Sequence, residues 1–535
     1  MKFFTLFFAL SSLFAVEEDS IDHLKILPKE ETPQIIEEDQ SRLLFGVHTA
    51  LPDKLLKIML QEKYEHSTWG LYVKDLISGK VIFDLNSNDL FLPASTSKIA
   101  SASALLHSLG PNYCFHTPVF ASGKIEKGIL RGDLILVGQG DLTLGGRQSG
   151  SDKISYTKMD HSVANEVPGA ILTKEDPLNG LNALAKQIYD SGIKKVIGDV
   201  QIDDSLFETT NKRGMVLSPV MINENLIDII INPTSLDQNA QVELRPEVPG
   251  YTFENQVVTI ENEGELNINV TREEEKIIVQ GTIPLTKKNI VRTLAVQNPK
   301  AFAKAAFIKA LKNQGVQIDN RSKSQKLNSL QNLTQVAVWE SPPLTEYVKL
   351  ILKVSHNSGA NLIPLLLATY HGKKTFEEGM KMIGDFLIQE VKLLPDTFVM
   401  SDAAGGNENR FTPQAEVQLL EFMKKQKFID FKRFLEAFPI LGVDGSMEDF
   451  GKDTLAVGKV WTKPGTGVVL NLATDHLFLM TQALAGYIEG KNGHLFAYML
   501  VVNNAKMPEM NDVQAIFEDE SQISSILYEH TEVVQ

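Results

Sequence analysis

A serine and a lysine three residues apart stand where an apolar helix is predicted to begin, and this pair constrains the fold most. Ser95 and Lys98 lie just before the helix-favouring run Ile99–Leu109. Residues three apart on a helix share one face, so the two side-chain heads can meet. A serine hydroxyl becomes a good nucleophile when a base takes its proton, and a lysine with a lowered pKa is such a base. Free backbone N–H groups at a helix N-terminus also stabilise an oxyanion. The pattern therefore indicates acyl transfer.

The S-x-x-K pattern occurs three times, and only the structural context separates the copies. Ser155 lies in a polar stretch typical of a loop, and Ser191 lies where a predicted helix runs into a turn. Of the three serines, Ser95 alone opens a predicted helix. Its assignment as the nucleophile therefore depends on the motifs that follow.

A second motif, Ser355-His356-Asn357, is the only S-x-N sequence of the chain and follows the amphipathic stretch Leu344–Val354. From a tight loop, residues i and i+2 can face one cleft, where a serine relays a proton and an amide holds a substrate carbonyl. We expect His356, between them, to be an exposed filler.

A third motif, Lys463-Pro464-Gly465-Thr466, follows the predicted strand Val457–Thr462. A cation beside a glycine and a hydroxyl, on the edge of a strand, suits an extended peptide that ends in a carboxylate. The three motifs thus supply a nucleophile with its base, a relay and an anion-binding group.

S-x-x-K, S-x-N and K-x-G, in this order, form the signature of penicillin-binding proteins and serine β-lactamases. The chain resembles the D-alanyl-D-alanine carboxypeptidase/endopeptidase family of low-molecular-mass, class C penicillin-binding proteins (DacB-like S13 peptidases) over roughly residues 46 to 505. Five further stretches carry this resemblance: Gly132–Asp141, Ile197–Asp204, Ser341–Leu344, Phe438–Ser446 and Ala483–Tyr487.

The spacing of the motifs predicts the domain organisation. Lys98 and Ser355 are 257 residues apart, which is room for an inserted domain, and the resembled family has one between its first two motifs. We expect an α+β transpeptidase-like domain, an antiparallel sheet with helices on its faces, with a large strand-rich insertion. The predicted parts are 46–116 and 298–535 for the transpeptidase-like domain and 117–297 for the insertion.

The resemblance implies a role for each motif residue. Ser95 is the acyl-ester nucleophile and Lys98 its base. Ser355 passes the proton to the leaving group, and Asn357 orients the acyl side. Lys463 and Gly465 belong to the substrate-binding strand, with Lys463 pairing with the terminal carboxylate, and the N–H of Thr466 joins that of Ser95 in the oxyanion hole. No cofactor is implied. Nor is a metal, because Asp141, Asp160 and His161 lack compact ligand spacing.

Two positions depart from the family pattern. Pro464 stands where the family usually has threonine, so we expect an edge strand and altered substrate or β-lactam affinity rather than inactivity, with Thr462 or Thr466 supplying the missing hydroxyl. Asp402-Ala-Ala-Gly405 stands where the family commonly has Asp-Gly-Ser-Gly, and we interpret it as a turn.

Charge and the N-terminal sequence restrict the partners and the location. The net charge of −15 argues against nucleic acid or an anionic membrane surface as partner. Residues 1–16 combine a lysine with a short apolar run, which predicts a signal peptide, no integral span in the mature chain, and export to the periplasm or cell surface of a bacterium. Residues 17–45 are rich in acidic residues and proline and are interpreted as a flexible linker.

The predicted function is a serine-type D-alanyl-D-alanine carboxypeptidase/endopeptidase that acts on peptidoglycan stem peptides and is acylated by β-lactams. Two alternatives stay open at this point. A β-lactamase would hydrolyse the β-lactam adduct quickly, and a non-catalytic cell-wall binding protein would keep the pocket without turnover.

Overall fold

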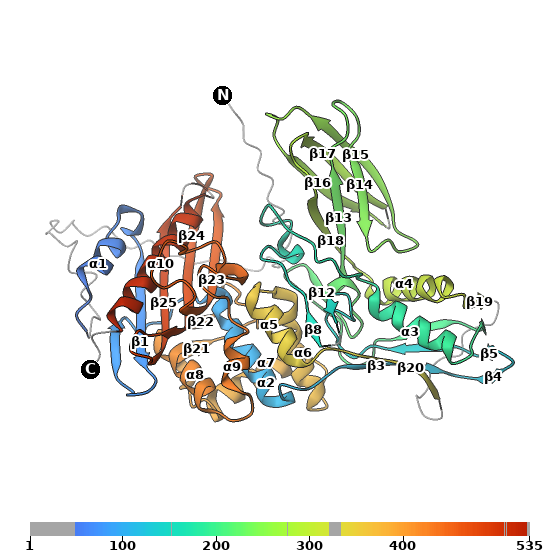
Figure 1. Cartoon of the computed structure of the whole chain (residues 1–535), viewed down its shortest axis with the longest axis horizontal. Coiled ribbons are helices and arrows are strands. Elements are labelled where there is room, and N and C mark those ends of the chain that lie inside the picture. Colours follow the sequence, from blue (N-terminus) through green and yellow to red (C-terminus); the bar gives the residue numbers. More distant parts are fainter. Residues whose placement is uncertain are drawn as a thin grey trace, which may run out of the picture.

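The computed structural model describes residues 49–531 except 151, 275, 320–332, 508 and 510. The predicted signal peptide (1–16) and linker (17–45) lie outside the described residues. Among the helices of the described part, none combines the length and the apolar character needed to cross a bilayer. Figure 1 shows two regions side by side: a sheet with its helices at the left, and a strand-rich region at the right.

The sheet at the left of Figure 1 is antiparallel and has five strands. In spatial order they are β2 (Val81–Leu85), β1 (Thr68–Asp75), β25 (Leu495–Lys506), β24 (His476–Glu489) and β23 (Val460–Asn471). The strands come from both ends of the chain, because β1 pairs with β25 along its whole length. β24 and β25 form an antiparallel hairpin, and β23, which carries the third motif, pairs with β24 at the edge of the sheet.

Helices cover both faces of this sheet, and the alternation of strand residues decides which helix each side chain meets. Leu500 and Val502 of β25 pack in one core cluster with residues of α1 (Asp53–Met59) and α10 (Asn511–His530). Met499 and Val501 pack in another cluster, which includes α8 (Pro413–Lys425). The predicted α+β architecture is confirmed.

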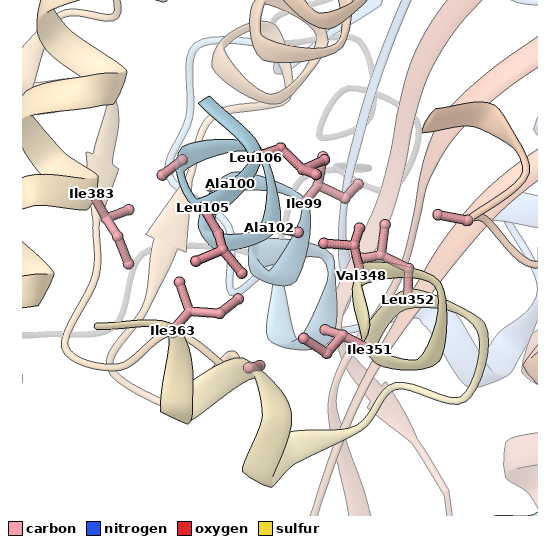
Figure 2. Close-up of a cluster of buried hydrophobic side chains, with 14 of the residues drawn as sticks. Ile99, Ala100, Ala102, Leu105, Leu106, Val348, Ile351, Leu352, Ile363 and Ile383 are labelled. Atoms are coloured by element: carbon pink, nitrogen blue, oxygen red, sulfur yellow. The ribbon is translucent and has the colours of Figure 1, made fainter. Parts of the chain in front are cut away.

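A bundle of buried helices lies beside α8 and surrounds α2 (Lys98–Leu109). Figure 2 shows Ile363 of α6 and Ile383 of α7 on one side of α2, with Val348, Ile351 and Leu352 of α5 on the other. The three surrounding helices are α5 (Leu344–Lys353), α6 (Asn357–Tyr370) and α7 (Phe376–Gln389). Every residue of α2 from Lys98 to Leu106 is buried, so the position of the helix is set on all sides.

The described residues of the inserted region form small sheets and two helices. One sheet has the order β10 (Val200–Asp203), β6 (Leu134–Val137), β3 (His116–Ala121) and β20 (Thr334–Glu340), and a second has β19 (Gln317–Asp319), β9 (Lys195–Ile197), β5 (Ile129–Arg131) and β4 (Lys124–Glu126). Two three-stranded sheets follow, β14 (Gln241–Arg245), β13 (Leu226–Asn232) and β18 (Ile290–Ala295), then β15 (Thr252–Ile260), β17 (Lys276–Pro284) and β16 (Asn267–Glu273). Its helices are α3 (Asn179–Asp190) and α4 (Pro299–Asn313).

Short elements complete the described part of the chain. The two-stranded pairs are β7 (Gln148–Ser149) with β8 (Lys153–Ile154), β11 (Thr210–Lys212) with β12 (Met215–Leu217), and β21 (Phe398–Val399) with β22 (Arg410–Phe411). The short helices are α9 (Phe431–Leu435) and the 3-10 turns η1 (Glu62–Tyr64), η2 (Ala94–Ser97), η3 (His161–Val163), η4 (Asn223–Asn225), η5 (Pro395–Thr397) and η6 (Gly445–Met447).

The second predicted domain boundary, at residue 297, is too early. β20 pairs with β3, and β19 pairs with β9, both within sheets of the insertion. Phe302 and Phe307 of α4 share one buried core cluster with α3 and with Trp339 of β20. The chain therefore returns to the transpeptidase-like region only after β20. The periodicity of a sequence predicts that a segment is helical, but it does not indicate in which domain the helix packs. The sequence pattern alone therefore could not assign α4 to the insertion.

We predict that Glu416→Gln stabilises the protein, and more so at about pH 9 than at about pH 5. Glu416 of α8 is fully buried, and neither carboxylate oxygen has a hydrogen-bond partner among the described residues. Burial raises the pKa of Glu416 to about 8. The folded state therefore retains a proton that the unfolded chain releases near its ordinary pKa of 4.5, so stability is lost as the pH rises from 4.5 through 8. The full shift corresponds to at most about 5 kcal/mol.

Thermal unfolding of both proteins at the two pH values measures this effect. Glu377→Gln, at an exposed position of α7, is the matched control and should give the same small change at both pH values. An equal gain for Glu416→Gln at the two pH values would contradict an uncharged buried carboxyl group.

Candidate active site

Two segments that are far apart in the sequence meet at the N-terminus of α2. Ser95 lies in η2, which leads directly into α2. Ser355 follows α5, and Asn357 is the first residue of α6. The Nζ atom of Lys98 lies 2.6 Å from Ser95 Oγ, 3.3 Å from Ser355 Oγ and 2.8 Å from Asn357 Oδ1. The structure thus brings the side chains of the first two motifs together on one amine.

Exposure differs sharply within this group. Lys98 is 0% exposed, whereas Ser95, Ser355 and Asn357 are half-buried. Ser95 is the only half-buried residue in the otherwise buried segment 91–106. The two hydroxyls and the amide can therefore meet a substrate, while the amine behind them is shielded from water.

The neighbours of Lys98 define how its amine is used. Besides the three motif residues, the backbone oxygen of Ala404 lies 2.7 Å from Nζ. Ala404 O and Asn357 Oδ1 are carbonyl oxygens, which only accept hydrogen bonds. A neutral amine has two N–H groups, and these two oxygens use both. Its lone pair is then left for the Ser95 hydroxyl at 2.6 Å, which is the arrangement of a base and its nucleophile.

Burial holds the pKa of Lys98 well below its ordinary value, and the positive charges of Lys463 and Arg213 lower it further. The negative charges of Asp402 and Glu166 oppose the shift. Removing an ammonium from water disfavours the charged form, so the neutral amine required of a base is favoured here.

Backbone strain accompanies the reactive groups. Ala94, which precedes the proposed nucleophile, has φ 44°, and Ser355 has φ 60°. Left-handed backbone disfavours a residue with a Cβ by about 1–2 kcal/mol. Hydrogen bonds from Ser97 Oγ to Ala94 O (2.9 Å) and from His356 N to Ile351 O (3.0 Å) hold the two bends.

The loop 402–405 forms a turn, as predicted, and also touches the reactive group. Asp402 Oδ1 accepts hydrogen bonds from the N–H groups of Ala404, Gly405 and Gly406 at 2.8–3.1 Å. This turn aims the carbonyl of Ala404 at Lys98. Sequence reasoning missed that contact because a backbone carbonyl leaves no side-chain signature; Asp402 before small residues signals only the turn.

The third motif lies on β23, against the segment that carries the nucleophile. A Cβ atom added to Gly465 would lie 2.3 Å from Pro93 O and 3.0 Å from Ser95 N, so only glycine permits this approach. Because β23 is an edge strand, Pro464 fits the sheet, as expected from the sequence.

The side chains of this strand are placed less simply than the sequence indicates. Lys463 is fully buried, and its Nζ donates to Pro464 O at 2.6 Å. Burial lowers the pKa of Lys463 to about 7. Thr466 is exposed, and its hydroxyl donates to Gln482 Oε1 at 2.8 Å. Thr462 was an alternative source of a hydroxyl in the cleft, but it is fully buried and bonds to Ala485 O at 3.3 Å, so that expectation is wrong.

The expectation that His356 is an exposed filler is also wrong. The side chain is 0% exposed, and its Nε2 lies 2.5 Å from the carboxylate of Glu224 in the inserted region. With i and i+2 facing the cleft, the residue between them necessarily points the other way, and there it meets another domain. The sequence held no signal for the partner, which is 132 residues away.

The three residues considered as metal ligands do not share one site. Asp141 Oδ1 accepts from the Tyr347 hydroxyl at 2.5 Å. Asp160 instead pairs with Arg147, at 2.6 Å and 3.0 Å, and His161 bonds to Asp228 Oδ1 at 2.6 Å.

The sequence of this chain matches a known protein family and several of its members. The sequence profile of the D-Ala-D-Ala carboxypeptidase 3 (S13) family matches residues 51–521. The chain is 25% identical to D-alanyl-D-alanine carboxypeptidase DacB of Haemophilus influenzae over 415 residues, which cover 74% of this chain and 78% of that protein. It is 24% identical to the D-alanyl-D-alanine carboxypeptidase of Actinomadura sp. strain R39 over 500 residues, or 87% and 83% of the two chains.

The fold is shared with a solved structure. The crystal structure of penicillin binding protein 4 (DacB) from Haemophilus influenzae superposes with a TM-score of 0.68 at 20% identity. The match covers 89% of this chain and 100% of the other. The arrangement of sheet, helices and inserted region is therefore common to both proteins.

We predict that Gly405→Ala destabilises the protein much more than Gly79→Ala. Both glycines are left-handed, with φ 97° and 77°, so both substitutions carry the same backbone penalty of about 1 kcal/mol. A Cβ at 405 would lie 2.0 Å from Ala94 O, whereas a Cβ at 79 meets nothing within 4 Å. We expect about 2 kcal/mol or more of additional loss for Gly405→Ala. Urea unfolding measures both, and equal losses would contradict the close contact between the two loops.

Proposed function

The chain belongs to the D-Ala-D-Ala carboxypeptidase 3 (S13) family, and we propose that it cleaves peptidoglycan stem peptides after the penultimate D-alanine through an acyl-ester on Ser95. The observation that carries this proposal is the buried amine of Lys98, 2.6 Å from the half-exposed Ser95 hydroxyl and bonded to the S-x-N motif. Family membership supports the proposed reaction, and this contact supports Ser95 as the residue that performs it.

Acylation begins when Lys98 takes the Ser95 proton. Ser95 Oγ bonds to the carbonyl carbon of the penultimate D-alanine, and the oxygen of that carbonyl gains negative charge. The backbone N–H groups of Ser95 and Thr466 stabilise this charge; loss of one such donor slows serine hydrolases by about a hundredfold or more. Gly465 serves the same end, because it lets β23 approach the backbone of Ser95.

The tetrahedral intermediate collapses when the C–N bond to the terminal D-alanine breaks. Lys98 returns the proton through Ser355, whose hydroxyl lies 3.3 Å from Nζ, to the leaving nitrogen. Asn357 accepts a hydrogen bond from the Lys98 amine and orients the acyl chain beside it. A water molecule then attacks the ester, releases the shortened peptide and restores the Ser95 hydroxyl. Transfer to an amine of another stem peptide would follow the same acyl-enzyme.

Lys463 is proposed to bind the terminal carboxylate. Its buried ammonium has only the Pro464 carbonyl as a hydrogen-bonding partner among the described residues. A carboxylate is a better partner for a desolvated ammonium than a carbonyl, because it supplies the missing counter-charge. Penicillins carry a carboxylate beside a strained amide, so the same groups would direct them to Ser95.

The location follows from the substrate. Peptidoglycan lies outside the cytoplasm, so we place the protein in the periplasm or at the cell surface, in agreement with the signal peptide predicted over residues 1–16.

We predict that benzylpenicillin adds one drug mass to the wild-type protein and none to Ser95→Ala. Intact-protein mass spectrometry after incubation measures the adduct. Ser155→Ala is the matched control, because Ser155 has the same S-x-x-K spacing but bonds to Glu175 Oε1 at 2.6 Å, and it should be labelled normally. Hydrolysed drug without an adduct would indicate a β-lactamase. Intact drug without an adduct would indicate a non-catalytic binding protein.

We also predict that the acylation rate of Ser95 rises with pH, with an inflection well below the ordinary lysine value of 10.5. The base works only when deprotonated, and burial and positive charge favour that state. Removing one of those charges should favour the protonated amine, so Arg213→Gln should move the inflection to higher pH. Stopped-flow or quenched acylation kinetics give the profile. An inflection near 10.5 would contradict a desolvated Lys98 as the base, whereas no shift in Arg213→Gln would mean that the charge of Arg213 does not act on this amine.

A further inference from the structure

The S-x-N motif is fastened to the inserted region through one side chain. His356 accepts a hydrogen bond at Nδ1 from the N–H of Gly359 (2.9 Å), which caps α6. Its Nε2 lies 2.5 Å from Glu224 Oε2. An N–H donor at Nδ1 and a carboxylate at Nε2 together require the neutral ring with its hydrogen on Nε2. Each ring nitrogen thus has one partner, and the ring has one orientation.

Glu224 is itself held by a buried cation. Arg147 donates to Glu224 Oε1 through Nε and to Oε2 through Nη2 at 3.1 Å, and it also binds Asp160 through two further bonds. Arg147, Asp160 and Glu224 are all buried, and His356 is enclosed with them. We call His356, Glu224 and Arg147 the clamp.

The clamp is one end of a larger network of alternating charge. His161 bonds to Glu224 Oε2 at 3.1 Å and to Asp228 Oδ1 at 2.6 Å, and Arg245 binds Asp228 Oδ2 at 3.0 Å. The two carboxylates raise the pKa of His161 to about 10, so this ring is charged. Three cations then balance three carboxylates: Arg147, His161 and Arg245 against Asp160, Glu224 and Asp228.

Donor atoms of Asp160, Glu224 and His356 lie within 4.8 Å of one another, which is a spacing that a metal ion could use. The guanidinium of Arg147 already bonds both carboxylates, and His356 presents an N–H rather than a lone pair to Glu224. The arrangement therefore fits an ion-pair network and not a cation site.

Glu224 contacts His356 from a strained backbone turn. Asn223, Glu224 and Asn225 have φ values of 48°, 59° and 58°, three left-handed residues in succession. Asparagine tolerates this conformation, but glutamate does so rarely. Hydrogen bonds from Asn223 Nδ2 to Leu226 O and from Asn225 Nδ2 to Val216 O keep the turn in place. Strain maintained by its surroundings is typical of functional positions.

We propose that the inserted region completes the active site by holding His356, which makes His356 a positioning residue for the reaction. This rests on the proposed function, because His356 stands between the two S-x-N residues that bond Lys98. A displacement of its ring moves Ser355 on one side and Asn357 on the other. Misplacement of a catalytic group by about 1 Å slows an enzyme by about a hundredfold.

The substitution that tests the clamp is His356→Asn. Asparagine is a good N-cap and can still accept from Gly359 N–H, but it is too short to reach Glu224. Arg245→Gln is the matched control, since it removes an ion pair from the far end of the same network without touching the S-x-N loop. We expect benzylpenicillin acylation of Ser95 to slow at least tenfold in His356→Asn, at a noncovalent binding constant within threefold of wild type. Arg245→Gln should stay within twofold in both quantities.

A second readout is independent of activity. Hydrogen exchange of the peptide covering residues 351–360 should become faster in His356→Asn and stay unchanged in Arg245→Gln. Equal effects of the two variants, in rate or in exchange, would mean that the network only stabilises the inserted region and would overturn the proposal. Wild-type rates and exchange in His356→Asn would overturn it as well. Absence of acylation in the wild type would refute the proposed function instead, and the exchange experiment would then still decide on the clamp.

Discussion

Burial of the Lys98 amine is the physical constraint on which the active-site architecture depends. An ammonium withdrawn from water is unfavourable unless it is paired, and no carboxylate hydrogen-bonds to Nζ among the described residues. The amine has instead two carbonyl acceptors and the hydroxyls of Ser95 and Ser355. This environment suits the neutral amine, and a neutral lysine beside a serine is a base. The same burial that would be a defect in an ordinary core supplies the chemistry here.

Such a site needs walls from several directions, which explains why distant segments build it. η2 and the start of α2 present Ser95 and Lys98 from one side, and the junction between α5 and α6 closes a second side with Ser355 and Asn357. The turn at Asp402 supplies a carbonyl, and β23 brings Gly465 against the nucleophile's backbone. Each wall is fixed by its own local device: an enclosed helix, a left-handed residue, an Asx turn or a missing Cβ. The inserted region adds a further support through His356, so it is joined to the catalytic centre and not merely appended to it.

The accuracy of sequence reasoning followed the range of the interactions involved. The helices α2 and α5 were predicted within one residue at each end, because periodicity and end signals are local. The boundary at 297 failed because α4 packs on α3 and β20 pairs with β3, contacts that span more than a hundred residues. His356 and Thr462 failed for a related reason. Histidine and threonine are both common at exposed positions. These two side chains are buried because another element packs against them.

The order and spacing of the three motifs determined the fold class, the presence of an insertion and the residues that meet at Lys98, because these depend on residue type and on separation along the chain. Only the three-dimensional structure decided that Lys98 is shielded from water, that Lys463 donates a hydrogen bond to Pro464 O, and that Glu224 bonds to His356. Desolvation, side-chain direction and inter-domain contact are properties of what surrounds a residue. A sequence records the residue itself, and its surroundings exist only once the chain has folded.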